Sequence, residues 1–400
     1  MINKKMVLWL TLIVITIIPI YAQQNDSEED FKIDWDKNVK DGVIITKYIG
    51  TKKEVRIPPS IQNNTVTGIG AFAFNGCTSL KSITIPDSVT IIGYGAFEGC
   101  TSLTSVTIPD SVTNIVMHAF ERCTSLTSVT IGNSVTSIGE RAFYECTSLT
   151  SLIIGNGVTS IGNAAFGICK SLTSVTIPDS VTNIGEYAFG WCTSLTSITI
   201  PDSVTSIGKE AFCQCTSLKS ITIGNNITSI GERAFYECTS LTSVTIPDSV
   251  TRIRELAFCD CKSLTSVTIG NSVTSIGAGA FKGCTSLKSI TIPNSVIEIL
   301  SISSLGIMGA FENCISLTSI TIPDSVTNIM RSAFLNCTSL TSVTFEGKIT
   351  PNSLGVKNQF SNSSEWFSPF DGDLRDKYLA SDGGPGTYKR FAGGNVWKKQ

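Results

Sequence analysis

Apolar and polar residues follow one fixed order along most of this chain of 400 residues. In the unit that begins at Cys100, the residues Leu103, Val106 and Ile108 have the spacing L-x-x-V-x-I, and one polar residue separates the last two. Alternation with a period of two is the pattern of a half-buried β-strand, and branched side chains favour a pleated strand. The pattern therefore predicts one short strand in each unit.

The remainder of the unit predicts a coil that closes on itself. Pro109 to Ser111 end the strand, because proline fixes φ and the short polar side chains bond to nearby amides; other units carry Gly-Asn here. Val112 and Ile115 then point inward again, and Phe120 and Cys123 close the coil. One unit cannot bury these apolar positions alone, whereas stacked neighbours can.

The unit repeats twelve times. Its cysteine recurs every 23 residues from Cys77 to Cys284, then after 30 residues at Cys314 and after 23 at Cys337, and a phenylalanine precedes each by three residues. The longer step holds seven extra residues around Ile299 to Ile307, which a repeat array accommodates as a loop on one face. We expect a right-handed repeat solenoid of about twelve coils with a parallel β-sheet.

The two ends of the chain differ from the repeats. Residues 1–22 combine two lysines, an apolar run from Val7 to Ile18, and Ala22, which predicts a secretory signal peptide and a secreted or cell-surface protein. The alternative is an uncleaved anchor, but the run is shorter than the ~20 residues that cross a bilayer. We assign 23–66 to an N-terminal segment and cap, 67–345 to the repeats, and 346–400 to a C-terminal cap or sorting tail.

Both terminal coils of a solenoid need a cover, because they otherwise expose strand edges and core. Val43 to Tyr48 and Glu54 to Ile57 have the pattern of two cap strands, and we expect the charged stretch Asn25 to Asp34 to be loose. After Phe345 the repeat stops. The aromatic residues beyond it are expected to cover the last coil, or else to form a docking or export signal; they are Phe360, Trp366, Phe367 and Phe370.

Fourteen cysteines in an exported chain would ordinarily form disulfides. Twelve of them occupy one position of the coil, so their β-carbons should lie ~4.8 Å apart on parallel vectors, whereas a disulfide needs ~3.8 Å. We therefore predict a ladder of mostly buried free thiols. Cys213 and Cys259 are additional, and no histidine or C-x-x-C partner supports metal binding by them.

Residue chemistry argues against an enzyme and against a cofactor or metal ion. The only histidine is His118, which we place on the solvated surface, and we expect the turn aspartates Asp87, Asp110, Asp179 and Asp202 each to satisfy its own turn. Stacked carboxylates that bind calcium or form an acid pair are the alternative. The net charge of −2 without basic blocks gives no reason to bind nucleic acid.

The repeat A-F-x-x-C-x-S-L-T-S-[VI]-T-I-P-x-S-V-T-x-I-G resembles the BspA-like class of leucine-rich repeats over about Thr67 to Phe345. The segment Gly42 to Ile69 resembles the incomplete first repeat of such proteins. The tail from Leu374 to Leu379, with the Gly-rich stretch up to Tyr388 and Trp397, resembles a C-terminal segment of some spirochaetal members. The resemblance implies a surface or secreted protein of a host-associated microbe, often an adhesin, without a catalytic motif.

Variation between the units indicates where a partner would bind. The outward strand residues hardly change, as in Ser105 and Thr107, whereas the positions around each Ala-Phe pair differ from unit to unit. Tyrosine, tryptophan and arginine are the preferred anchors of protein interfaces. The predicted partner is host extracellular matrix or another microbial surface. The candidate ligand-binding residues are Tyr94, Arg122, Tyr144, Tyr187, Trp191 and Tyr236.

Three other interpretations remain open at this point. The variable positions are equally well explained as unconstrained loop residues. The whole chain could serve a structural role in the cell envelope without a specific ligand. Finally, the regular Ser/Thr face could bind an ordered lattice such as ice or a polysaccharide.

Overall fold

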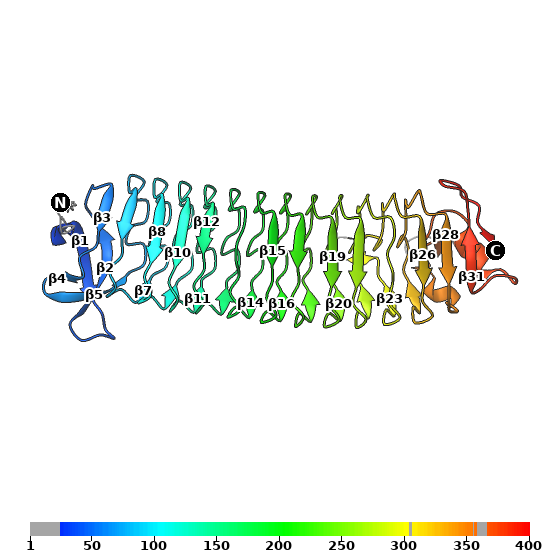
Figure 1. Cartoon of the computed structure of the whole chain (residues 1–400), viewed down its shortest axis with the longest axis horizontal. Helices are drawn as coiled ribbons and strands as arrows, with labels where there is room; N and C mark the ends of the chain where they lie inside the picture. Colours follow the sequence, from blue (N-terminus) through cyan, green and yellow to red (C-terminus); the bar gives the residue numbers. More distant parts are fainter. Residues whose placement is uncertain (1–24, 304–305, 355, 358–365) are drawn as a thin grey trace, which may run out of the picture.

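The computed structural model shows a rod of stacked coils with the N-terminal cap at one end and the C-terminal cap at the other (Figure 1). It describes residues 25–303, 306–354, 356–357 and 366–400. The predicted signal peptide lies outside these residues. In the described part of the chain, no helix has the length and apolar character needed to cross a membrane. The parallel repeat solenoid is confirmed.

The predicted strand of the unit is present in most coils, with alternate residues buried, as in β8. Neighbouring coils pair in parallel and exactly one repeat apart in sequence, so that Val129 lies opposite Val106. These strands form one row along the rod: β3 (Glu54–Arg56), β6 (Ser82–Thr84), β8 (Ser105–Ile108), β10 (Ser128–Ile131), β12 (Ser151–Ile153), β15 (Ser197–Thr199), β17 (Ser220–Thr222), β19 (Ser243–Ile246), β21 (Ser266–Ile269), β26 (Ser319–Ile322) and β28 (Ser342–Phe345).

A second row of strands forms a 15-stranded sheet, which the sequence pattern did not predict. Most of its members are two residues long, with an inward isoleucine after an outward polar residue. The row begins with β2 (Gly42–Tyr48) and β5 (Asn64–Ile69) and continues through β7 (Ile91–Ile92), β9 (Asn114–Ile115), β11 (Ser137–Ile138), β13 (Ser160–Ile161), β14 (Asn183–Ile184), β16 (Ser206–Ile207), β18 (Ser229–Ile230), β20 (Arg252–Ile253), β22 (Ser275–Ile276), β23 (Glu298–Ile299) and β27 (Asn328–Ile329).

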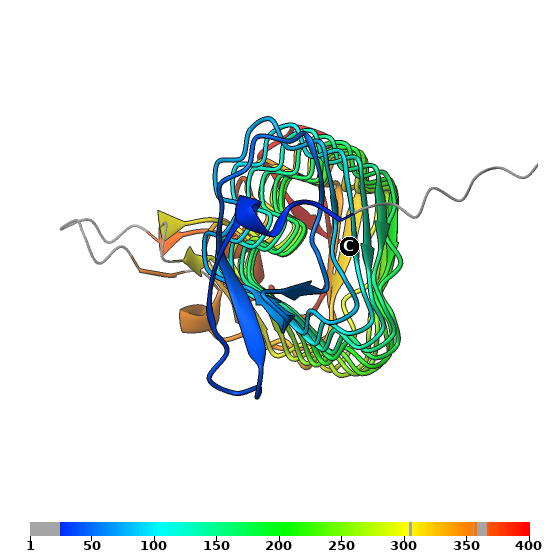
Figure 2. The same cartoon turned by 90° about the vertical axis from the view of Figure 1, so that its left-hand side faces the viewer.

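Along the rod axis the coils superpose closely around one interior (Figure 2). The phenylalanines of successive coils form a continuous stack, with ring centroids from 4.8 to 5.5 Å apart. Tyr48 of the N-terminal cap begins this stack and Phe370 of the C-terminal segment ends it. The core is therefore a set of ladders in which each residue type packs against its own equivalents.

Threonine hydroxyls form two rows of hydrogen bonds between neighbouring coils, which we call hydroxyl lines. Thr196 Oγ1 donates to the carbonyl of Thr173, and Thr159 Oγ1 donates to that of Thr136, one repeat earlier in each case. Similar bonds recur along the rod, and serine hydroxyls form a third line, as from Ser203 to Val181. These bonds explain why the unit keeps its threonines at positions where they contribute nothing to the core.

The N-terminal cap is more ordered than the sequence suggested. The stretch from Asn25 to Asp34 was expected to be loose, and that prediction is wrong: it contains a 3-10 turn, Glu28–Asp30, and most of β1 (Phe31–Trp35), which pairs antiparallel with β2. Phe31 packs on Tyr48, and this contact supplies the apolar burial that holds the charged stretch in place. A short strand, β4 (Ser60–Ile61), completes the cap.

The C-terminal segment covers the last coil. Its strand β31 (Gly386–Lys389) pairs antiparallel with β28, and β32 (Lys398–Lys399) pairs with β31. Helix α1 (Leu374–Leu379) precedes β31 in the sequence. Phe370 stacks on Phe334, as expected. Of the other aromatics, Phe360 lies outside the described residues, and Trp366 and Phe367 form β30 (Trp366–Phe367), paired with β29 (Val356–Lys357).

The seven-residue insertion forms a small hairpin that projects from the rod, as expected for a repeat array. It contains β24 (Ile302–Ser303) and β25 (Gly306–Ile307), which pair antiparallel. The coil pairing continues past it, because β23 pairs directly with β27. The insertion therefore does not break the stack.

Candidate binding surface

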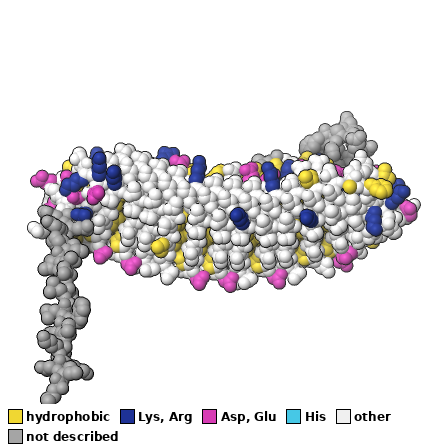
Figure 3. All heavy atoms as spheres, turned by 45° about the horizontal axis from the view of Figure 1, so that its top comes forward, with side chains coloured by type: hydrophobic (Ala, Val, Ile, Leu, Met, Phe, Trp, Pro, Cys, Tyr) yellow, Lys and Arg dark blue, Asp and Glu magenta, His cyan; other side chains and the backbone are white. Residues whose placement is uncertain are grey.

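The variable positions lie together along the rod. We call this surface the ridge and define it as the two residues before and the two residues after the Ala-Phe pair of each coil, such as Glu186, Tyr187, Gly190 and Trp191 in one coil. The Ala and Phe of every coil are buried, whereas most residues of the ridge are at least partly exposed; buried exceptions include Glu121, Cys213 and Cys259. Another face of the rod is largely uncharged, with scattered lysine, arginine and acidic side chains (Figure 3).

The ridge backbone is left-handed at two places in most coils, immediately before Ala-Phe and immediately before the cysteine. Tyr187 has φ 55° and Trp191 has φ 58°. A non-glycine residue in this conformation costs roughly 1–2 kcal/mol, so glycine would be the stabilising choice. Glycine is indeed present at these places near both ends of the repeats, at Gly95 and Gly99 and again at Gly279 and Gly283.

Between those ends the glycines disappear. From His118 to Leu256 no left-handed position of the ridge holds glycine, asparagine or aspartate. The chain instead keeps larger side chains there, including the β-branched Ile168 with φ 61°, which is a genuine outlier for its type. Backbone strain of this kind persists only where the surrounding structure imposes it, and here the same two positions are left-handed in successive coils.

Three of the six predicted residues lie close together. Tyr187 and Trp191 stack with ring centroids 5.8 Å apart and an interplanar angle of 8°. Trp191 and Tyr236 line one groove, two coils apart. The structure therefore joins Tyr187, Trp191 and Tyr236 into one aromatic group.

The other three predicted residues are occupied by contacts within the chain. Arg122 pairs with Glu145 at 3.0 Å, and the ring of Tyr144 lies under the guanidinium of Arg141, 4.8 Å from its centroid. Both are on the ridge, Tyr144 two coils and Arg122 three coils before Trp191.

Tyr94 is more remote. Its ring contacts Phe72 and His118 at centroid distances of 5.1 Å. It lies six coils before Tyr236, about 29 Å at ~4.8 Å per coil. A compact ligand cannot contact Tyr94 and Tyr236 together.

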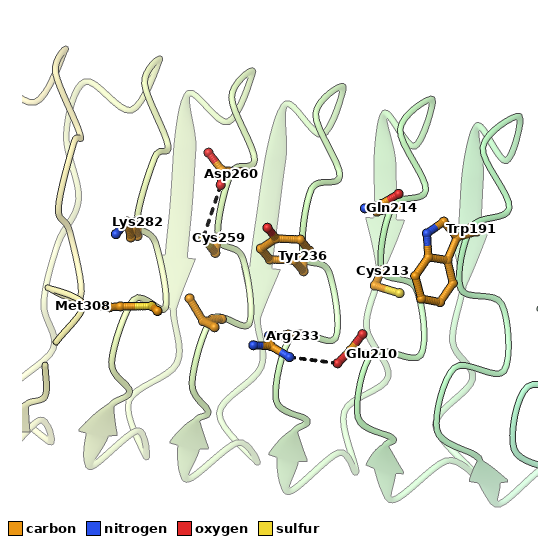
Figure 4. A pocket seen from close by; sticks show the side chains of 11 residues that line it. Trp191, Glu210, Cys213, Gln214, Arg233, Tyr236, Cys259, Asp260, Lys282 and Met308 are labelled. Carbon is orange, nitrogen blue, oxygen red and sulfur yellow. Dashed lines mark hydrogen bonds and ion pairs between the residues drawn. The ribbon is translucent and has the colours of Figure 1, made fainter. Parts of the chain in front are cut away.

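The groove at the aromatic group has a volume of about 330 Å³ and runs along the rod over several coils (Figure 4). Trp191 and Tyr236 stand on either side of Cys213, and Leu256, Cys259 and Met308 continue the apolar lining. The remaining lining residues are polar: Glu210, Gln214, Arg233, Asp260 and Lys282. The sequence analysis missed most of these residues, although the additional cysteines Cys213 and Cys259 were a signal, since they depart from the regular one cysteine per coil.

Burial keeps two tyrosines and a cysteine at the groove in their neutral forms. Burial, together with a hydrogen bond to Glu210, raises the pKa of Tyr187 to about 12, and a hydrogen bond to Glu237 together with burial raises that of Tyr236 further. Burial raises the pKa of the Cys213 thiol to about 12. At neutral pH the groove therefore offers phenol hydroxyls and thiols, not anions, from these residues.

His118 differs from its prediction as a solvated residue. Its side chain is only 19% exposed, and Nδ1 bonds to the buried carboxylate of Glu121. The left-handed backbone at His118 turns the ring along the ridge toward Tyr94, where it packs instead of facing water. The contact is a local ion-pair or hydrogen-bond pair on the surface of the stack.

Two of the four predicted turn aspartates, Asp110 and Asp202, differ from expectation because they bond to the next coil, and Asp248 does the same. Asp110, Asp202 and Asp248 each accept a bond from the backbone N–H of an asparagine one repeat later. Each of these pairs joins a Pro-Asp turn to a Gly-Asn turn. The two turn types therefore complement each other between coils.

All fourteen cysteines are free, and all but Cys77 are buried, which confirms the predicted thiol ladder. The thiol of each ladder cysteine from Cys100 onward donates to the carbonyl of a phenylalanine in the preceding coil, as from Cys192 to Phe166 at 3.3 Å. Within the described residues, no group of three or more cysteine, histidine or acidic side chains is placed to hold a metal ion.

With this geometry in view, the comparisons with known proteins identify the class. The family model described as the BspA type leucine-rich repeat region matches the chain over 67–196, 136–265, 182–304 and 251–364, and the chain belongs to that family. Leucine-rich repeat proteins are generally protein-interaction scaffolds without enzymatic activity, and no enzyme family matches. No curated protein matches the chain.

A solved structure agrees with this assignment. A leucine-rich repeat protein from Bacteroides ovatus is 31% identical with a TM-score of 0.52, over 78% of this chain and 92% of that one. A leucine rich cell surface protein from Faecalibacterium prausnitzii is also 31% identical, with a TM-score of 0.45, over 87% of this chain and 98% of that one.

Proposed function

We propose that this chain is an exported, surface-displayed protein that binds another protein through its ridge, with host matrix proteins or the surface of another cell as the partner. The predicted signal peptide supports export. The family supports protein binding, and the lining of the groove, in which a tryptophan and a tyrosine stand beside arginine and carboxylates, has the composition of an interface centre.

One observation carries this proposal. From His118 to Glu237, six successive coils have no glycine, asparagine or aspartate at their left-handed positions, although glycine would adopt this backbone with less strain. Toward both ends of the repeats, glycine, asparagine or aspartate occupies most of these positions, with Phe72 and Ser332 as the exceptions. This contrast supports the ridge between His118 and Glu237 as the binding surface.

The test is a variant with alanine at Tyr144, Tyr187, Trp191 and Tyr236. We expect it to lose at least about tenfold in binding to immobilised matrix proteins or to cells, because about 1.4 kcal/mol corresponds to tenfold and hot-spot aromatics each exceed that. Binding is measured by surface plasmon resonance with the full chain.

The control replaces outward residues of the strand row, Thr107, Thr130 and Thr199, by alanine. Their side chains lie on a different face and are expected to leave binding unchanged. Equal loss in both variants, or full binding by the ridge variant, would refute the ridge as the binding surface.

A further inference from the structure

The groove of the ridge has a definite direction and length. Its lining residues come from six successive coils, with Trp191 at one end and Met308 at the other. At ~4.8 Å per coil, five steps span about 24 Å, the length of about seven residues of extended polypeptide at ~3.3 Å each. The groove is open to solvent, so a chain can enter it from the side.

One part of the groove is shaped for an apolar side chain. Cys213 lies in the coil between those of Trp191 and Tyr236. Its side chain is small and only 1% exposed, so it leaves a gap between the two large rings. The preceding coil has Gly190 here, where an added Cβ would lie 3.1 Å from the Cys213 sulfur. Tyr187 stacks on Trp191 and holds the indole in place. The gap over Cys213 is therefore bounded by rigid apolar groups.

The charges of the groove are paired, with one exception. Glu210 pairs with Arg233 at 3.2 Å, and Lys282 pairs with Glu312 at 3.0 Å. Asp260 has no cationic partner in the described part of the chain; its carboxylate contacts the thiol of Cys259 at 3.5 Å. Asp260 lies two coils beyond Cys213, about 10 Å, and a cation there would complement it.

Two polar groups of the groove are also available to a backbone. The indole N–H of Trp191 and the side-chain amide of Gln214 make no hydrogen bond with any other residue that the structure describes, and both residues line the groove. A polypeptide in extended form presents carbonyl and N–H groups at regular intervals that such groups can bind. A row of isolated donors and acceptors beside an apolar gap suits a peptide.

We propose that this groove binds an extended segment of a partner protein, about seven residues long, that inserts an apolar or aromatic side chain over Cys213 and places a lysine or arginine beside Asp260. The segment carries these two side chains two to four residues apart, as the separation of about 10 Å requires. This inference rests on the proposed function, which it deepens by naming the chemistry of the ligand.

The experiment selects a phage-displayed library of random twelve-residue peptides against the immobilised full chain. We expect enriched peptides to share an aromatic or aliphatic residue and a basic residue two to four positions away. Selected peptides are then synthesised, and their affinity for wild type and variants is measured by fluorescence anisotropy. A consensus without a basic residue, or no enrichment above background, overturns the proposal.

The variants are chosen so that loss of folding cannot imitate loss of binding. Trp191→Gly removes one wall of the gap, and the left-handed backbone at Trp191 makes glycine conformationally favourable. We expect at least a tenfold loss of affinity with an unchanged or higher midpoint of thermal unfolding. Phe72→Gly is the matched control: it also removes a large aromatic side chain at a left-handed position (φ 58°), five coils before the groove, and binding should be unchanged. Retention of affinity by Trp191→Gly overturns the proposal.

The cationic contact has its own variant. Asp260→Asn keeps the shape of the side chain and removes its charge. We expect peptides with the basic residue to lose affinity fivefold or more, and the same peptides with methionine in place of that residue to lose none. An equal effect on both peptides overturns the role of Asp260.

Aromatic grooves also bind sugars, and a glycan array with wild type and Trp191→Gly covers that case. Glycan binding that depends on Trp191, without peptide enrichment, overturns the peptide ligand and identifies a sugar ligand. If the four-alanine ridge variant loses cell binding while no peptide is enriched, the proposed function stands and this inference fails.

Discussion

At the scale of the residue, the cysteine of each coil is a hydrogen-bonded apolar side chain. Cys192 is fully buried, and its thiol donates to the carbonyl of Phe166. Burial raises the pKa of Cys192 to about 12 from the ordinary value of 9.0, and it raises that of Cys215 well above 9.0. These thiols remain protonated in the fold at a pH where an unfolded chain has already lost its thiol protons.

The sign of the resulting pH effect follows directly. Above pH 9 the unfolded chain binds fewer thiol protons than the folded chain, so the free energy of unfolding falls as the pH rises. The stabilisation is complete below pH 9 and is lost toward pH 12 for Cys192. Each such thiol contributes up to about 1.4 kcal/mol per pH unit to the slope.

A variant with Cys192→Ala and Cys215→Ala tests this effect. We expect it to be less stable than wild type at pH 7.5, yet to lose stability more slowly between pH 9 and pH 10.5. Urea unfolding followed by circular dichroism under reducing conditions gives both slopes. Parallel slopes for the two proteins would show that the thiols do not contribute.

At the scale of the element, hydroxyl lines supplement the short strands. Thr196 Oγ1 donates to the carbonyl of Thr173 at 3.2 Å, whereas the equally exposed Thr199 makes no side-chain hydrogen bond with the residues that the structure describes. We expect Thr196→Val to lower the free energy of unfolding by about 1 kcal/mol. The matched control, Thr199→Val, should be neutral or slightly stabilising, because valine favours strands.

Both variants are measured by urea unfolding at pH 7.5. The hydroxyl line predicts a difference between two identical chemical changes three residues apart. Equal midpoints of urea unfolding for the two variants would mean that the bond to Thr173 makes no net contribution to the free energy of unfolding.

The two rows of strands show which elements the sequence pattern can predict. The period of 23 and the alternation in Ser105–Ile108 are sufficient to predict the coil and its first strand, because each inward residue repeats in every unit. The second row, such as Ser137–Ile138, has only two residues per coil, which is too short for a periodicity. Its pairing comes from stacking, a property of neighbouring coils.

The candidate site was only half predictable for a related reason. Variation between units identified Tyr187, Trp191 and Tyr236, which contact one another or line one groove. It could not identify Met308, because the longer step from Cys284 to Cys314 hides which residue is equivalent to it. Nor could it identify Asp260, whose relevance depends on the lack of a cationic partner in the described part of the chain. Nor could it show that Arg122 is already paired with Glu145.

At the scale of the whole molecule, the ends decide the state of association. A stack of coils is stable along its length, since each coil contacts only its neighbours, but its last strand presents open hydrogen-bonding groups. Here β31 covers β28. Arg390 fastens this cover, because its buried guanidinium donates to the carbonyls of Leu340, Cys337 and Gly394 and lies over the Trp397 ring.

Arg390→Ala should therefore release the C-terminal cover while leaving the repeats folded. Three carbonyls lose their donor, and leaving each buried acceptor unsatisfied costs about 1 kcal/mol or more. We expect faster hydrogen exchange in β28 and β31, unchanged protection before Cys314, and concentration-dependent end-to-end association in sedimentation velocity. The control is Phe391→Ala, which removes a side chain that is 92% exposed and should leave a monomer. Association is expected because the open edge of a parallel stack can pair with a second copy. If the Arg390→Ala protein were monomeric with unaltered hydrogen exchange, strand pairing alone would be sufficient to hold the cover.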